Sequence, residues 1–287
     1  MPACLFVSDL HGNTEKYQRL LDVIEAHPPP AVFLGGDLLP NHLVMMGASS
    51  HAGRDFVSDW LVTHLRELRE RLGEAYPRLF LILGNDDGRV EEPGLLAAEE
   101  EGLCEYLHGR RASLGPFDVY GYSCVPPTPF RLKDWERYDV SRYVDPGCLS
   151  PEEGFHTVRM DEDKLKYATI QDELAQLVGD RSLENAIMLF HSPPYQSNLD
   201  RAGLDGRMVD HVPLDVHVGS IAIQRLINNR QPLVTLHGHI HESARLTGYW
   251  FEQMGRTRAL SAAHDGPELA LVRFDPEVPE KASRTLL

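Results

Sequence analysis

Residues 4–13, with the sequence Cys-Leu-Phe-Val-Ser-Asp-Leu-His-Gly-Asn, give the first indication of the fold. The apolar residues 4–7 are followed almost at once by Asp9 and His11. A short apolar run that ends in polar residues is typical of a strand buried in a sheet. Behind it, apolar residues recur at helical spacing over residues 16–26, until three consecutive prolines end the pattern. The stretch therefore predicts a buried strand, a polar turn and a covering helix.

The same arrangement recurs along the chain, with apolar runs at residues 31–34, 79–83, 187–190 and 233–236. Helical patterns lie between and around these runs, at residues 56–72, 95–107, 165–178 and 221–227. Alternation of strands and helices is typical of α/β proteins with parallel strands. The tail, from residue 249 to residue 274, predicts antiparallel strands. We therefore expect an α/β protein that forms a single domain over residues 1–287.

Each of the five apolar runs ends on residues that can bind metal ions: Asp9, His11, Asp37, Asn85, His191, His239 and His241. Carboxylate oxygens and imidazole nitrogens are common metal ligands, and the carboxyl ends of parallel strands share one edge of a sheet. Seven such donors exceed what one transition metal takes. They suit two metals about 4 Å apart that share a carboxylate. The alternative is that these polar residues only cap turns.

Taken in order, these residues form the motifs Asp-x-His, Gly-Asp, Gly-Asn-Asp-Asp, His and Gly-His-x-His, from residue 9 to residue 241. The series resembles the signature of the calcineurin-like metallophosphoesterase superfamily. The resemblance implies a four-layer α/β/β/α sandwich of two mixed sheets. It also implies a metal-dependent phosphoesterase that cleaves phosphodiester or phosphomonoester bonds by attack of a metal-bridging hydroxide. Phosphodiesters or cyclic nucleotides are the favoured substrates.

The resemblance further implies how the ligands divide between the metals. Asp9, His11 and His241 would hold the first ion, Asn85, His191 and His239 the second, and Asp37 would bridge the two. A bridging position needs a carboxylate because it offers one oxygen to each cation. The nitrogen-rich set suits Mn²⁺, Fe or Zn²⁺ better than Ca²⁺ or Mg²⁺. We therefore expect two divalent transition-metal ions, Mn, Fe or Zn, as cofactors.

One position departs from the signature, because Asp86 stands where the family has His, or Cys in some members. The family His is interpreted as the group that protonates the leaving oxygen or stabilises the phosphoryl group, whereas an ordinary Asp is ionised at pH 7 and would repel a phosphate. Three outcomes are open. Asp86 is held protonated beside the phosphate and Asp87, another histidine such as His42 or His51 replaces it, or the substrate has a good leaving group. We treat Asn85, Asp86 and Asp87 as candidate catalytic residues.

The departure at Asp86 also supports a hypothesis from another functional class. The chain would then be a non-catalytic metal-binding scaffold or interaction protein with the same fold. The difficulty of this hypothesis is that every other ligand position of the signature is intact. The two hypotheses differ in whether the metal-loaded protein hydrolyses phosphoesters.

Residues 126–160 are rich in proline, aromatic and charged residues and show no clean period. We therefore expect an excursion that is inserted outside the core. Its cationic residues Arg131, Lys133 and Arg137, together with His42 in another loop, are candidates for binding the substrate phosphate. The alternative is a structured surface loop with local salt bridges and a docked tryptophan.

The composition limits the range of partners. The 287 residues include 28 Lys and Arg against 43 Asp and Glu, which gives a formal net charge of −15. A field of this sign repels polyanions, so nucleic acid and anionic membranes are not expected as partners, and a small-molecule phosphoester is the expected substrate. No run approaches the roughly 20 apolar residues that span a bilayer, and the four cysteines form no Cys-x-x-Cys pair. We expect a cytoplasmic protein, and the sequence indicates no oligomeric state.

Overall fold

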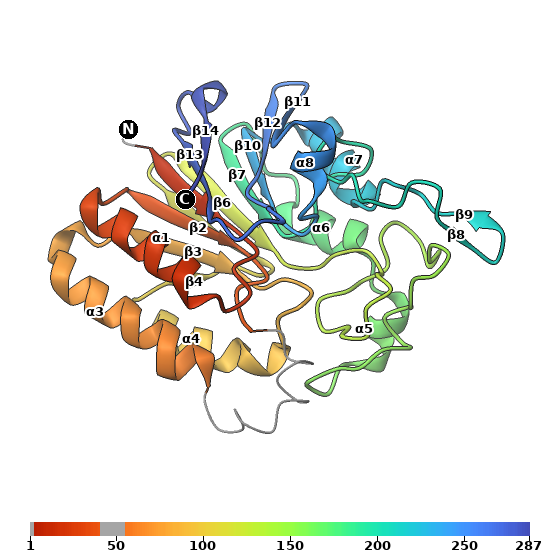
Figure 1. The fold of residues 1–287 in the computed structure, drawn as a ribbon, viewed down its shortest axis with the longest axis horizontal. Helices are drawn as coiled ribbons and strands as arrows, with labels where there is room; N and C mark the ends of the chain where they lie inside the picture. Colours follow the sequence, from red (N-terminus) through yellow and green to blue (C-terminus); the bar gives the residue numbers. More distant parts are fainter. Residues whose placement is uncertain (1–2, 41–54) are drawn as a thin grey trace.

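The computed structural model describes residues 3–40 and 55–287, and its main strands form two six-stranded sheets (Figure 1). The first sheet contains, in spatial order, β14 (Ser283–Leu286), β13 (Ala270–Phe274), β1 (Cys4–Val7), β2 (Ala31–Gly35), β3 (Arg78–Ile82) and β4 (Glu105–Tyr106). The second contains β11 (Phe251–Met254), β12 (Thr257–Ser261), β10 (Val234–His237), β7 (Ala186–Phe190), β6 (Phe117–Tyr122) and β5 (Arg110–Leu114). A small hairpin of β8 (Met208–Val209) and β9 (Val212–Pro213) projects to one side (Figure 1).

Both sheets are mixed. In the first sheet β1, β2, β3 and β4 are parallel, and β13 and β14 extend it in antiparallel fashion. In the second sheet β12, β10, β7 and β6 are parallel, and the edge strands β11 and β5 are antiparallel to their neighbours. The predicted α/β fold with two mixed sheets is therefore confirmed.

The apolar core occupies both faces of each sheet. Because successive residues of a strand point to opposite faces, Phe6, Phe33 and Phe80 pack together with Ile187 and Leu189 of the second sheet. Their neighbours along the strands point the other way and join a second core cluster, which also contains the apolar faces of the helices. Burial on both faces explains why the strands read as continuous apolar runs rather than as alternating ones.

Helices cover the outer faces of the sheets (Figure 1). The first sheet is covered by α1 (Thr14–Ala26), α3 (Thr63–Leu72) and α4 (Glu92–Glu100), and the second by α6 (Ile170–Val178) and α7 (Ile221–Arg230). Shorter elements are α5 (Glu162–Tyr167), α8 (Ser243–Thr247), a π-helical turn at Phe56–Val62 and 3₁₀ turns at Gly73–Ala75, Arg89–Glu91 and Pro279–Lys281. The order of layers is the predicted helix, sheet, sheet, helix. Among the described residues, no helix is both long and apolar enough to cross a bilayer.

Two predicted helices differ from the structure. The helix expected over residues 95–107 ends at Glu100, because Gly102 adopts a left-handed conformation with φ of 73° and the chain turns into β4. The helix expected over residues 165–178 is divided into α5 and α6. The break lies at Thr169, whose side-chain oxygen accepts the N–H of Asp172 at 3.1 Å and starts a new helix there.

The expectation that residues 126–160 lie outside the core is wrong for the middle of this segment. Trp135 is fully buried and belongs to the core cluster that also contains the apolar faces of the helices. The segment is tied to the body of the protein by isolated bridges, which pair Val125 with Glu136 and Tyr138 with Thr169. The aromatic and apolar residues of this segment therefore contribute to stability, although it contains no regular strand.

Candidate metal centre

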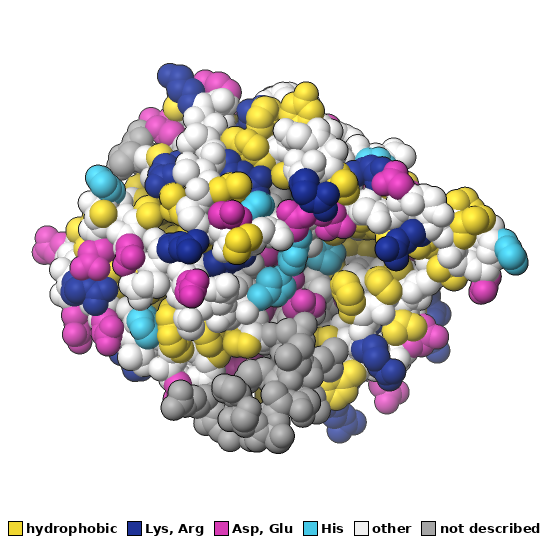
Figure 2. Space-filling model, in the orientation of Figure 1, with side chains coloured by type: hydrophobic (Ala, Val, Ile, Leu, Met, Phe, Trp, Pro, Cys, Tyr) yellow, Lys and Arg dark blue, Asp and Glu magenta, His cyan; other side chains and the backbone are white. Residues whose placement is uncertain are grey.

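The seven predicted ligands lie in loops at the carboxyl ends of five parallel strands. Asp9 and His11 follow β1, Asp37 follows β2, Asn85 follows β3, His191 follows β7, and His239 and His241 follow β10. These ends meet at one edge of the two sheets, so side chains that are far apart in the sequence gather there. On the surface, histidine and acidic side chains are grouped near the centre of the face shown in Figure 2.

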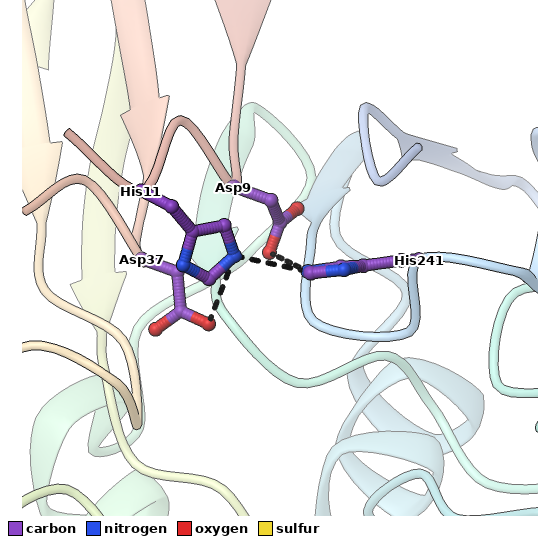
Figure 3. Close-up of side chains that lie close together, drawn as sticks. All are labelled: Asp9, His11, Asp37 and His241. Carbon is purple, nitrogen blue, oxygen red and sulfur yellow. Dashed lines mark hydrogen bonds and ion pairs between the residues drawn. The ribbon is translucent and has the colours of Figure 1, made fainter. Parts of the chain in front are cut away.

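A first cluster consists of Asp9, His11, Asp37 and His241, whose ligand atoms all lie within 4.8 Å of one another (Figure 3). The Nε2 atoms of His11 and His241 are 3.2 Å apart. His241 Nε2 lies 3.4 Å from Asp9 Oδ1, and His11 Nε2 lies 4.0 Å from Asp37 Oδ2. Two carboxylates and two imidazoles thus point at a common centre.

A second cluster consists of Asp37, His191 and His239. His191 Nε2 lies 3.2 Å from Asp37 Oδ2 and 3.0 Å from the side-chain oxygen of Asn85. Asn85 therefore joins this cluster. Asp37 belongs to both clusters, which is the arrangement that a carboxylate between two cations requires.

Hydrogen bonds outside the clusters hold the ligand side chains in these orientations. His191 Nδ1 donates to the Gly35 carbonyl at 2.8 Å, which leaves Nε2 directed at Asp37. Asp9 Oδ1 accepts the N–H of His239 at 3.0 Å, and the hydroxyl of Ser8 donates to the other oxygen. Sequence reasoning missed Ser8 and Gly35. Ser8 could have been noticed as a polar residue between a buried strand and a ligand, whereas a backbone carbonyl leaves no trace in residue type.

Two glycines allow the backbone to come close to the ligands. A Cβ atom on Gly84 would lie 2.6 Å from His191 Nε2 and closer still to Asp37 Oδ1. A Cβ atom on Gly238 would lie 2.9 Å from Asp9 Oδ2. These distances are shorter than van der Waals contact, so a side chain at either position would displace a ligand.

Several ligands have an unusual backbone conformation. Asp9, His11, Asp37 and His239 all have positive φ angles, of 56°, 45°, 52° and 75°. Residues with a Cβ atom rarely adopt this left-handed region, because of steric contact with the backbone. Such conformations concentrate at functional sites, where the surrounding structure imposes them. The strain therefore supports a functional interpretation of this edge.

The aspartates and histidines of the site shift the pKa values of one another. Burial disfavours the charged form of His191, but the facing Asp37 carboxylate outweighs burial and raises the pKa of His191 to about 10. Burial likewise opposes ionisation of Asp37, but the charge of His191 lowers its pKa to about 2. Burial and the charge of His191 lower the pKa of His239 to about 3. The carboxylates are thus stabilised by adjacent positive charge, which a divalent cation also supplies.

The donor set fits a pair of transition-metal ions. It combines imidazole nitrogens, carboxylate oxygens and one amide oxygen, and its most buried members are Asp9, Asp37 and His191. Asp9, His11 and His241 could hold one ion and Asn85, His191 and His239 the other, with Asp37 shared.

The candidate catalytic residues that follow β3 have different surroundings. The Asp86 side chain is 26% exposed, and burial together with the charge of Asp37 raises its pKa to about 6. Asp87 is fully buried and accepts the N–H groups of Leu38, Leu39 and Gly84 at 3.1, 2.8 and 2.9 Å. A direct catalytic role for Asp87 does not agree with this burial. Its carboxylate instead ties the loop after β2 to the loop after β3.

Two of the candidate substrate-binding residues, Lys133 and Arg137, are buried and paired inside the protein. Lys133 is fully buried, and its Nζ donates to Glu136 and to the Thr128 carbonyl. Arg137 is also buried and donates to the carbonyl of Glu136. This burial does not agree with phosphate binding by Lys133 or Arg137, and the structured loop with a docked tryptophan describes their surroundings better.

Arg131 and His42 are the other two candidates for binding the substrate. Arg131 is exposed on the surface of the segment that contains Lys133 and Arg137. His42 and His51 lie outside the described residues. Arg131 and His42 therefore stay candidates on the strength of the sequence.

The two-sheet fold and the ligands at its edge define an α/β protein with a candidate dinuclear metal centre. Residues 3–243 match the family model of the calcineurin-like phosphoesterases, and the chain belongs to this family. The family resemblance of the motifs is thereby confirmed. No curated protein matches the chain in sequence.

Solved structures share the fold over the full length of the chain. The crystal structure of TT1561 of Thermus thermophilus has a TM-score of 0.55 and 17% identity, and the alignment covers 99% of this chain and 98% of that one. A second crystal structure has a TM-score of 0.59 and 17% identity, with 100% of this chain and 99% of that chain covered. At this level of identity the likeness shows the fold alone.

Proposed function

We propose that this chain is a phosphoesterase that uses two divalent transition-metal ions to hydrolyse phosphodiester or phosphomonoester bonds of small molecules. The observation that carries the proposal is the position of Asp37, whose carboxylate belongs to both ligand clusters. Membership of the calcineurin-like phosphoesterase family supports the reaction type. The predominance of imidazole donors supports Mn, Fe or Zn as the metals.

The buried and the exposed residues of the site would each contribute to phosphoester hydrolysis. When bound in such a centre, a pair of cations polarises phosphoryl oxygens and lowers the pKa of a water molecule. Asp37 and His191 are buried, so their ligand atoms are held in place and away from bulk water. The side chains of His11 and His241 are 29% and 34% exposed. They therefore mark the open side, from which a substrate would approach.

The charge of the site supports phosphodiesters, including cyclic nucleotides, over phosphomonoesters. Among the described residues, Asp9 and Asp37 form their ion pairs with histidines. Lys133 and Arg137 are committed to contacts inside the protein. A phosphomonoester carries close to two negative charges near pH 7, whereas a diester carries one. A diester therefore needs fewer protein cations for binding.

Metal content and hydrolysis of two chromogenic esters test the proposal. Protein purified without chelator should contain two transition-metal ions per chain. With added Mn²⁺ it should hydrolyse bis-p-nitrophenyl phosphate faster than p-nitrophenyl phosphate. A protein that holds two metals and turns over neither ester would contradict the proposed activity. Faster hydrolysis of the monoester would contradict only the preference for diesters.

Asp86 favours a second candidate function, that of a metal-binding scaffold or interaction protein. The family His that would help the leaving group is missing at this position. Metal binding without turnover of either ester is the outcome that supports the scaffold. A location in the cytoplasm stays a prediction from the sequence.

A further inference from the structure

Building on the proposed function, we propose that Asp86 is a positioning residue whose single carboxylate orients one ligand of each metal position. This role differs from the proton transfer expected at the corresponding place in the family. It follows from where the two carboxylate oxygens lie, because each of them faces a different ligand side chain. Both contacts use the atom of the ligand that does not point into the ligand clusters.

The first contact sets the orientation of Asn85. Its side-chain N–H donates to Asp86 Oδ1 at 3.1 Å, and its side-chain oxygen lies 3.0 Å from His191 Nε2 in the second cluster. An amide presents its oxygen on one side and its NH₂ group on the other. Holding the NH₂ group at Asp86 therefore keeps the oxygen, which is the atom that can bind a cation, directed at the second metal position.

The second contact concerns His11. Asp86 Oδ2 lies 3.8 Å from His11 Nδ1, while His11 Nε2 points into the first cluster and lies 3.2 Å from His241 Nε2. At 3.8 Å the contact is longer than a hydrogen bond and acts through charge. A carboxylate on this side favours the tautomer with the proton on Nδ1 and leaves the lone pair of Nε2 for a cation.

The backbone of the same residue contributes a third contact, which side-chain substitutions leave in place. The N–H of Asp86 donates to Asp37 Oδ1 at 2.8 Å.

At the side-chain position, a carboxylate can face both Asn85 and His11 because it has two oxygens. A neutral imidazole has one acceptor nitrogen and could accept from only one of them. An aspartate at this position therefore offers a supporting role that the family histidine could not fill, and does not merely remove an acid.

Zinc affinity tests the positioning role directly. Metal-free wild type, Asp86→Asn and Asp86→Ala would be titrated with Zn²⁺ in competition with a chromophoric chelator. Loss of such supporting contacts typically weakens metal binding about 10- to 100-fold, so we expect a loss of that order in Asp86→Ala and a smaller loss in Asp86→Asn. Wild-type affinity in Asp86→Ala would overturn the inference.

A matched control separates this effect from a general loss of charge. The side chain of Asp118 is 35% exposed, against 26% for Asp86, and it lies at the opposite end of β6 from the site. Asp118→Asn should bind zinc like the wild type. Circular dichroism of each metal-free variant checks that the fold is retained. A variant that binds zinc weakly only because it is unfolded counts against the positioning role.

Nitrogen NMR of the zinc-loaded protein gives a second readout that a merely structural residue would not change. In the wild type we expect a protonated Nδ1 resonance from His11, assigned by its absence in His11→Gln. In Asp86→Ala this resonance should shift or broaden through exchange with water. An unchanged resonance would overturn the inference.

The outcomes distinguish this inference from the proposed function. A wild type that binds zinc but hydrolyses no ester contradicts the phosphoesterase activity alone, and weaker zinc binding in Asp86→Ala would still support the positioning role. A wild type that hydrolyses esters, with full zinc affinity in Asp86→Ala, contradicts the positioning role alone. A wild type that binds no metal contradicts both.

Discussion

Asp37 is the residue that joins the two candidate metal positions, because its carboxylate belongs to both clusters. In Asp37→Asn one oxygen is replaced by an NH₂ group, which cannot bind a cation. We expect at least one of the two metal ions to be lost, as measured by elemental analysis after gel filtration. Asp22→Asn, on the exposed face of α1, is the control and should keep both ions. Two ions per chain in Asp37→Asn would rule out the bridging role.

Gly84 tests the close packing of backbone against ligands. A methyl group at this position would lie 2.6 Å from His191 Nε2, so one of the two must move. We expect Gly84→Ala to weaken zinc binding at least tenfold in a chelator competition. Gly203→Ala is the control, because its Cβ atom would meet nothing nearer than 3.7 Å. Equal affinities in the two variants would show that the loop after β3 adapts more easily than this geometry indicates.

A buried ion pair holds in place the segment that contains Trp135. Lys133 and Glu136 are both fully buried and paired, although burial raises the pKa of Glu136 to about 7. Lys133→Met leaves Glu136 buried without its partner, and removing one member of such a pair typically lowers the free energy of unfolding by about 3–5 kcal/mol. The double variant Lys133→Met/Glu136→Gln should recover most of that loss in urea denaturation. Additive losses would show that the two residues act independently.

His108 links the two sheets and makes the stability of the protein depend on pH. It follows β4 of the first sheet, bridges to Gly121 of β6 in the second, and accepts the N–H of Ser123 at 3.1 Å. Burial and the charges of Arg89 and Arg137 lower the pKa of His108 to about 3. Below its ordinary pKa of about 6.5, the unfolded chain therefore binds a proton that the folded protein does not.

The stability contributed by neutral His108 is complete above pH 6.5 and is lost as the pH falls toward 3. Between pH 7 and pH 5 the loss should be roughly 1–2 kcal/mol of unfolding free energy. His108→Asn keeps an acceptor for Ser123 but does not titrate, so its stability should change less over this range. Identical pH slopes in urea denaturation of the two proteins would show that His108 does not contribute.

The sequence predicted what depends on local pattern and missed what depends on tertiary burial. The apolar runs and the polar residues after them predicted the strands and the edge at which Asp9, Asp37 and His191 meet, because strand direction alone brings those ends together. The surroundings of Lys133 could not be predicted in this way, since a charged residue type does not tell whether it faces water or a buried partner. The contact of Asp86 with His11 likewise depends on loop geometry that no spacing encodes.

The left-handed conformations of Asp9, His11, Asp37 and His239 work against the stability of the chain. Glycine would adopt them with less strain, by up to roughly 1 kcal/mol at each position. Selection of variants for thermal stability alone would therefore favour glycine at these positions. Such substitutions would remove the candidate metal ligands. All four positions nevertheless carry side chains that can bind a metal ion.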